Sequence, residues 1–226
     1  MTLLGLDTST AASSACVLRA DGEGFDVTPP PARLSGPPKH ASELMPAVAS
    51  AMEMAEVRWE DLEAIAVGVG PGTFTGLRIG IATARALASA NELPLRRVSS
   101  LAALAAGIRE NAAAALALPL IDARRGEVFA ALYDGAEEVW PPFAAQPETL
   151  VTRLREGGFR PLAAGDGSLR FRGMLEEAGI PVEPDGSEAH VVRALHICRL
   201  GRGVPDEPPG VVLPEYLREP DAKPHQ

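Results

Sequence analysis

Cysteine and aromatic side chains are scarce in this chain of 226 residues, which has two cysteines and an aromatic fraction of 4%. Cys16 and Cys198 lie far apart among apolar residues, and there is no Cys-x-x-Cys motif. This usage disfavours a disulfide framework and fits a reducing compartment. We therefore expect a cytoplasmic protein without disulfides.

Long apolar runs and a basic N-terminal segment are also absent. The segment 1–7 carries no basic residue, and the alanine-rich stretch 101–121 is interrupted by Arg109, Glu110 and Pro119. A membrane span needs about 20 consecutive apolar residues. We expect neither a signal peptide nor contact with a membrane.

Basic residues are outnumbered, because 30 acidic residues stand against 21 basic ones and give a net charge of −9. Such a chain repels phosphate backbones unless its basic residues gather on one face. We expect it to bind nucleic acid poorly by itself.

Catalytic motifs are missing as well. The four histidines, at positions 40, 190, 196 and 225, include no pair one helical turn apart, the spacing with which two ligands reach one metal ion. His190 and His196 fall on different faces of a helix predicted over 188–202. No Ser-His-Asp or Cys-His motif has a recognisable context. The sequence therefore predicts no metal site and no hydrolase.

The most distinctive stretch that is present runs from Gly68 to Gly80, with the sequence GVGPGTFTGLRIG. An apolar strand over 64–69 enters a Gly-Pro-Gly corner, and a helical pattern continues to Ala90. We expect Thr73 or Thr75 to cap this helix. Small residues recur every four positions along it, which predicts close packing against another helix: Gly76, Gly80, Ala84 and Ala88.

The order of predicted elements suggests a duplication. In each half, three strands precede alternating helices and strands, and the first helix is expected over 44–55, with Pro46 near its start. This order favours an α/β fold of two lobes with mixed sheets flanked by helices. We predict lobes at 1–99 and 100–203, with the last helix packing back on the first lobe, and a proline-rich tail at 204–226.

Carboxylates end the first strand of each half, where α/β folds place ligands. A nucleotide or anion could be held there by groups from both halves, but a strand end and a turn are the simpler explanation of the two carboxylates, and packing explains the Gly70 to Gly72 corner equally well. The candidates are Asp7, Thr8, Ser9, Gly70, Gly72, Asp122 and Gly165.

Three segments together resemble the bacterial TsaB (YeaZ) family: DTST at 7–10, the GPGTFTGLRIG run, and DARRGEV at 122–128. The resemblance implies a duplicated actin-like fold (ASKHA, RNase H-like). It also implies a non-catalytic subunit in the transfer of a threonylcarbamoyl group to the adenosine beside the anticodon of tRNAs that read ANN codons. The implied partners are the catalytic TsaD and the ATPase TsaE, with ATP and magnesium used by the wider complex and no cofactor required by this chain. A homodimer is expected when the chain is alone, and tRNA contact only through the complex.

The same resemblance places the partner surface on the helices of the first half. Arg78 and Arg85 could contact tRNA or the partner, or simply face solvent. The alternative function is an independent ATPase or small-molecule kinase that uses Asp7 and Asp122. The residues predicted at the partner interface are Leu44, Val48, Ala51, Phe74, Gly76, Leu77, Gly80, Ile81, Ala84 and Ala88.

Overall fold

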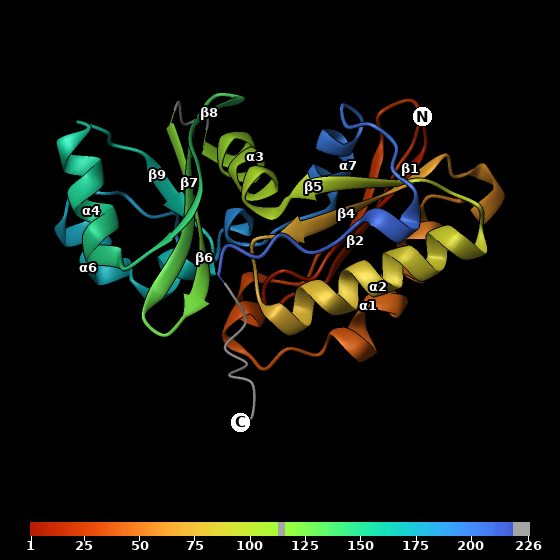
Figure 1. Cartoon of the computed structure of the whole chain (residues 1–226), viewed down its shortest axis with the longest axis horizontal. Helices are drawn as coiled ribbons and strands as arrows, with labels where there is room; N and C mark the ends of the chain where they lie inside the picture. Colours follow the sequence, from red (N-terminus) through yellow and green to blue (C-terminus); the bar gives the residue numbers. More distant parts are fainter. Residues whose placement is uncertain (113–115, 219–226) are drawn as a thin grey trace.

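The computed structural model describes residues 1–112 and 116–218. The two β-sheets follow one another along the long axis of the molecule, which is horizontal in Figure 1. Helices lie between the sheets and on both outer faces. The end of the predicted tail, 219–226, and with it His225, lies outside the described residues.

The first sheet has the strand order β3-β2-β1-β4-β5, in which β1 pairs antiparallel with β2 and parallel with β4. All seven residues of β4 are buried, as expected for a strand that is parallel to both neighbours and covered on both faces. The strands are β1 (Leu3–Asp7), β2 (Ser14–Leu18), β3 (Gly24–Val27), β4 (Ala64–Gly70) and β5 (Leu95–Ser99).

The second sheet has the order β8-β7-β6-β9, and an isolated parallel bridge between Ala163 and Val182 extends it beyond β9. Both sheets therefore repeat one topology, which confirms the predicted two-lobed α/β fold with mixed sheets. The strands are β6 (Leu116–Arg124), β7 (Glu127–Asp134), β8 (Glu137–Ala145) and β9 (Leu162–Ala164).

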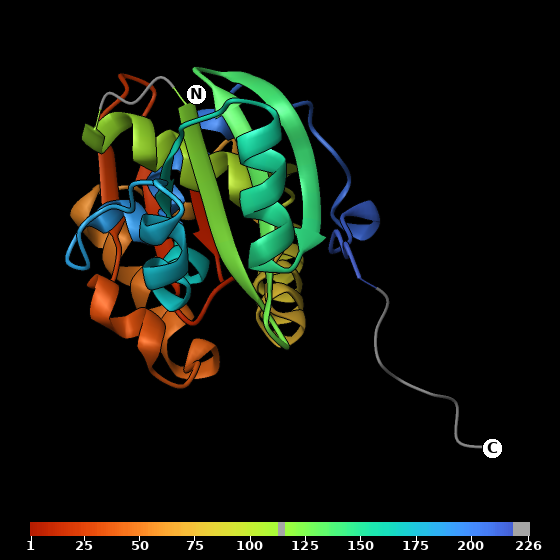
Figure 2. The same ribbon diagram turned by 90° about the vertical axis from the view of Figure 1, so that its left-hand side faces the viewer.

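The helices form three layers. α1 (His40–Met54) and α2 (Phe74–Ala90) cover the outer face of the first sheet, and α3 (Ser100–Ala112) and α7 (Ala194–Gly201) lie between the sheets. α4 (Pro147–Glu156) and α6 (Arg172–Glu177) cover the outer face of the second sheet, and α5 (Asp166–Arg170) packs at β6. Figure 2 shows the teal helix α4 against the green strands of that sheet.

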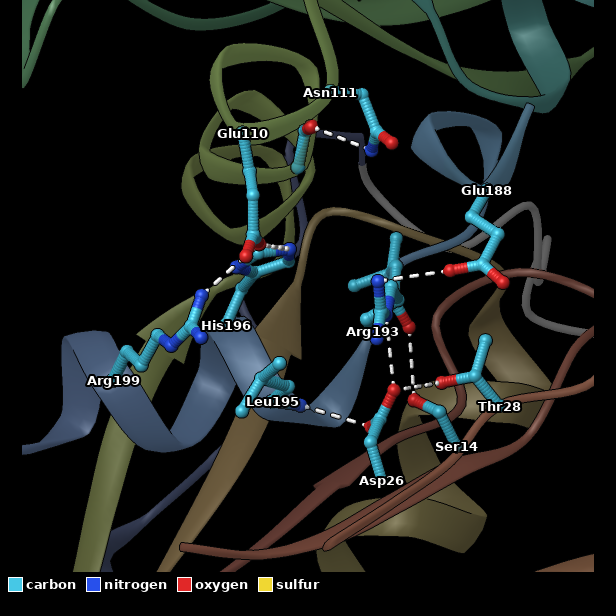
Figure 3. Close-up of polar contacts among 12 residues, drawn as sticks. Ser14, Asp26, Thr28, Glu110, Asn111, Glu188, Arg193, Leu195, His196 and Arg199 are labelled. Atoms are coloured by element: carbon cyan, nitrogen blue, oxygen red, sulfur yellow. Dashed lines mark hydrogen bonds and ion pairs between the residues drawn. The ribbon is translucent and has the colours of Figure 1, made fainter. Parts of the chain in front are cut away.

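A polar network fastens α7 to the first sheet (Figure 3). The Asp26 carboxylate in β3 accepts hydrogen bonds from the Leu195 N–H, at 3.2 Å, and from Arg193 Nε, at 2.9 Å. Arg193 also donates to Glu188 at 2.9 Å. The last helix of the second half therefore rests on the first lobe.

Two predicted helices differ from the structure. The helix expected over 188–202 is broken: Glu188–His190 is a 3-10 turn and Val191 is extended, because Val191 and Val192 are buried and Ser14 Oγ donates to the Val192 carbonyl. The helix expected over 44–55 begins at His40, so Pro46 lies in its interior. Pro46 removes one intrahelical hydrogen bond, to the carbonyl of the exposed Ser42, which water can satisfy.

The described part of the tail, 204–218, runs back along the first lobe. Glu207 forms an antiparallel bridge with Leu95, Val212 is fully buried in the core beneath α2, and the Glu215 N–H donates to the Val69 carbonyl at 2.8 Å. Among the described helices, none has the length and apolar character needed to cross a membrane.

Candidate functional site

The Gly-Pro-Gly corner joins β4 to α2 and packs against the loop after β1. Gly70 has a φ of +117°, in the region that favours glycine. A Cβ added at Gly72 would lie 2.5 Å from the Ser9 carbonyl oxygen, to which the Thr73 N–H donates at 2.7 Å. We had expected Thr73 or Thr75 to cap α2. Thr73 is the N-cap residue, but its hydroxyl makes no capping hydrogen bond.

The ridge of small residues on α2 faces the interior of the subunit. A Cβ added at Gly76 would lie 2.0 Å from the Thr8 carbonyl oxygen, and one added at Gly80 would lie 2.2 Å from Thr8 Oγ1. The Thr8 hydroxyl donates to the Gly76 carbonyl at 2.8 Å. The ridge therefore accommodates the loop after β1, where we had predicted another helix.

Most residues predicted at the partner interface are consequently buried within the subunit. They form the inward faces of α1 and α2 over the first sheet, so these side chains leave little surface that a partner could contact directly. Phe74 is the exception, with 41% of its surface exposed. The corrected residues are Leu44, Val48, Ala51, Gly76, Leu77, Gly80, Ile81, Ala84 and Ala88.

The opposite sides of the two helices are exposed and largely apolar. Met45 and Met54 of α1 are 44% and 51% exposed. The exposed positions of α2 include Ala82, Ala86 and Ala90, together with Phe74, Thr75, Arg78 and Ser89. α1 and α2 run side by side over the same sheet (Figure 1), so the exposed sides of the two helices belong to one layer of the molecule, in which the polar residues Ser42 and Glu53 are also exposed. We define the outer helix face as Met45, Ala49, Met54, Phe74, Ala82 and Ala86.

Asp7, the first predicted nucleotide contact, is buried and satisfied by its own subunit. Its carboxylate accepts hydrogen bonds from the Ser9 N–H at 2.8 Å, the Ser9 hydroxyl at 2.7 Å and the Ser100 hydroxyl at 2.9 Å. Burial nevertheless raises the pKa of Asp7 to about 6. These contacts show Asp7 tying the β1 loop to α3.

Asp122, the carboxylate predicted on the second lobe, forms ion pairs with Arg170, at 2.8 Å, and Arg124, at 3.1 Å. Its backbone N–H donates to the half-buried Asp166, at 2.9 Å, and desolvation raises the pKa of Asp166 to about 6. Gly165 is packed too tightly for any side chain, because an added Cβ would lie 2.0 Å from the Leu120 carbonyl oxygen.

Potential metal ligands do not gather in the residues 1–112 and 116–218, where no group of three or more His, Cys, Asp or Glu side chains could hold an ion. His190 accepts from the Gly165 N–H at 3.1 Å. His196 packs between α7 and α3, and burial lowers its pKa to about 4, so the ring is neutral at pH 7. Both rings contribute to packing in the structure.

A cavity of about 670 Å³ lies between the two lobes and the tail. We call it the interlobe cavity. Its walls are the first turn of α2 (72–76), the turn between β6 and β7 (122–125), the end of the described tail (215–218), and two further residues, Pro38 and Phe129. Of the predicted ligand contacts, it brings together Gly72 and Asp122, while Asp7, Thr8, Ser9, Gly70 and Gly165 lie outside its lining.

The aromatic wall of this cavity was missed by the sequence analysis. The rings of Phe74 and Tyr216 stack with centroids 5.3 Å apart, Arg78 lies over the Phe74 ring at 3.7 Å, and Arg78 Nε donates to the Tyr216 hydroxyl at 3.1 Å. The two rings are 142 positions apart in the chain (216 minus 74), so no local pattern signals their contact.

Comparison with known proteins identifies relatives of the whole chain. The profile of the TsaD family, tRNA N6-adenosine threonylcarbamoyltransferase, matches residues 36–154. The tRNA threonylcarbamoyladenosine biosynthesis protein TsaB of Bacillus subtilis is 31% identical, over 99% of this chain and 96% of its own length. The Escherichia coli protein of the same name is 31% identical, over 80% of this chain and 78% of its own.

A solved structure agrees with these matches. YeaZ from Pseudomonas aeruginosa superposes with a TM-score of 0.76 at 30% identity, covering 96% of this chain and 99% of that one. The similarity therefore extends over both lobes and does not stop at the glycine-rich segment. The chain belongs to the TsaB (YeaZ) family and has its actin-like two-lobed fold.

Proposed function

We propose that this chain is a non-catalytic subunit of the machinery that makes threonylcarbamoyladenosine in tRNA. Membership of the TsaB family supports the pathway. The internal hydrogen bonds of Asp7 and the ion pairs of Asp122 support a structural role for the two carboxylates that an independent ATPase would need. The chain then requires no cofactor of its own and works in the cytoplasm beside its tRNA.

The outer helix face is the observation that carries the proposal. Apolar side chains exposed together on a monomer mark surfaces that bind other proteins. Two adjacent helices that present methionines and alanines can receive two helices of a partner at short distance, since alanine adds little bulk. The partner we propose is a TsaD-like catalytic subunit, because the TsaD profile also matches this chain and related folds can present related faces.

Further contacts follow from the same arrangement. In the absence of the catalytic partner, a second copy of this chain would cover the outer helix face and form a homodimer. A TsaE-like ATPase joins the assembly, and tRNA is reached through the complex. Arg78 and Arg85 flank the outer helix face on α2 and are the candidate contacts to tRNA or to the partner.

Size-exclusion chromatography with light scattering tests the proposal on the chain alone and mixed with its TsaD-like partner. Ala82→Arg places a long charged side chain on the outer helix face and should abolish both the homodimer and the heterodimer. Ala136→Arg is the matched control, because Ala136 is exposed in the turn between β7 and β8 on the second lobe. It should assemble like the wild type.

Assembly of Ala82→Arg with unchanged affinity would contradict the proposed surface. The ATPase alternative is checked on the same preparations, with circular dichroism confirming that each is folded. The isolated chain should release no phosphate from ATP and magnesium above a blank. Hydrolysis that disappears in Asp7→Asn or Asp122→Asn would instead favour the independent ATPase.

A further inference from the structure

We propose that an arginine-rich face of the second lobe binds the phosphate backbone of the tRNA within the assembly. The proposal rests on the proposed function, which supplies the tRNA, and it adds a contact on the lobe opposite to Arg78 and Arg85. We call this face the arginine strip. It consists of three arginines and three aromatic residues from β8, α4 and the loop after α4: Arg153, Arg155, Arg160, Trp140, Phe143 and Phe159.

The arginines of the strip have no partners within the subunit. Arg153, Arg155 and Arg160 are exposed, and none of them makes a hydrogen bond or an ion pair with a residue in 1–112 or 116–218. Arginines that fasten the fold are paired, as Arg193 is with Asp26 at 2.9 Å. Each guanidinium of the strip therefore keeps its N–H donors for an external anion, and its planar fork matches two oxygens of one phosphate.

Arg155 and Arg160 line one cavity of about 230 Å³ on the second lobe. The rest of its described lining is apolar or glycine and contains no carboxylate: Leu154, Gly158, Phe159, Ala178, Gly179 and Ile180. The C-terminal ends of α4 and α6 reach the same cavity, and each is equivalent to about half a negative charge. Two full positive charges outweigh them, so the cavity stays attractive to an anion. It is smaller than the usual site for a free ligand, which favours a phosphate that enters from a polymer.

The aromatic rings hold Arg153 beside this cavity. Its guanidinium lies 4.1 Å from the centroid of the Trp140 ring and 4.6 Å from that of Phe143. Trp140 contacts Phe159 edge to face, with centroids 5.2 Å apart, and Phe159 lines the cavity. A guanidinium that stacks on a ring still has N–H groups at its edge, and a held side chain loses less entropy when it binds. The strip is therefore continuous from Arg153 to Arg160.

The surroundings of the strip favour a polyanion. α4 and α6 also carry exposed carboxylates, Glu148, Glu156 and Glu177, but none of the three forms an ion pair with the strip. In a chain with a net charge of −9, three unpaired arginines on one face direct a polyanion to that face. α4 and α6 lie at the opposite end of the molecule from α1 and α2 (Figure 1), so a partner on the outer helix face leaves the strip open. Phosphate contacts carry no sequence information, so the strip would position the tRNA without selecting it.

Fluorescence anisotropy with a labelled tRNA transcript tests the proposal on the chain assembled with its TsaD-like partner. Over about 50 to 200 mM salt, Arg155→Ala and Arg160→Ala should each reduce the slope of log K against log salt by about 1, because each removes one phosphate contact. Each should weaken binding by about threefold to tenfold. The matched control is Arg58→Ala, an exposed arginine on the first lobe. It should stay within about twofold of the wild type, with an unchanged slope.

The same titration on the isolated chain at about 50 mM salt provides a second setting. Failure to assemble with the partner would contradict the proposed function and would still leave the strip tested. In this setting the wild type should bind more weakly than the assembly does, and both variants more weakly still. Absence of saturable binding in both settings, or binding that neither variant changes while circular dichroism shows them folded, overturns the proposal. Unchanged RNA binding with weakened assembly in light scattering also overturns it, and would assign the strip to an acidic protein surface.

Discussion

At the scale of single residues, Asp7 shows how burial and hydrogen bonding oppose each other. Three hydrogen bonds favour its carboxylate, yet burial outweighs them and raises its pKa from 3.8 to about 6. The folded protein therefore binds this proton more tightly than the unfolded chain does. The contribution of Asp7 to the free energy of unfolding is greatest below pH 3.8 and decreases as the pH rises to about 6.

Asp7→Asn should remove this decrease, because the amide oxygen can still accept from Ser9, the amide NH2 can donate to the Ser100 hydroxyl, and no buried charge remains. At pH 7 the variant should be more stable than the wild type by about 1 to 3 kcal/mol. Urea denaturation at pH 4 and pH 7 measures the difference, which should shrink toward zero at the lower pH. The exposed Asp134→Asn is the control and should change stability at neither pH. A stability difference between Asp7→Asn and the wild type that is the same at pH 4 and pH 7 would contradict the raised pKa of Asp7.

At the scale of elements, α2 packs so closely on the loop after β1 that glycine is needed at Gly76 and Gly80 of α2. Gly80→Ala should gain about 1 kcal/mol of helix propensity, but its Cβ would lie 2.2 Å from Thr8 Oγ1. We expect a net loss of roughly 1 to 3 kcal/mol in the free energy of unfolding, measured by chemical denaturation.

Gly173→Ala on α6 is the matched control, because no heavy atom lies within 4 Å of the added Cβ. Its stability should be unchanged or higher. If both substitutions behaved alike, the inward packing of the ridge would be refuted. A larger change such as Gly80→Leu would disturb the fold itself, so it cannot report on a partner surface.

At the scale of the whole molecule, the tail joins the two lobes. Tyr216 stacks on α2 of the first lobe, while Arg218 pairs with Glu127 of β7 in the second. Val212 anchors the tail with a fully buried side chain, whereas its neighbour Leu213 is 59% exposed. This contrast allows the attachment of the tail to be tested with adjacent substitutions.

Val212→Asp should release the tail while both lobes stay folded. Burial of one valine side chain stabilises by about 1.5 to 3 kcal/mol, and an unpaired buried carboxylate costs more than that, so detachment is the lower-energy outcome. Limited proteolysis with mass spectrometry should show cleavage within 204–218 at least several-fold faster, with unchanged far-ultraviolet circular dichroism. Leu213→Asp should be cleaved at the wild-type rate. Equal rates in the two variants would show that Val212 is not the anchor.

The sequence alone determined the features that depend on local pattern. The apolar run of β4, the Gly-Pro-Gly corner and the recurrence of strand and helix signals predicted the two lobes, and three segments, DTST, GPGTFTGLRIG and DARRGEV, together indicated the family. These features were predictable because strand alternation, helix periodicity and turn chemistry involve residues close together in the chain.

Only the tertiary structure decided what each surface contacts. The row of small residues on α2 indicates that another part of the structure packs closely against it. The same row could accommodate either the loop at Thr8 or a helix of a partner, so the sequence could not tell the inner side of α2 from the outer helix face. The interlobe cavity depends on Phe74, Arg124 and Tyr216, which come from three distant segments. Long-range packing brought them together, and its energy is distributed over the whole core, so no short stretch of sequence encodes it.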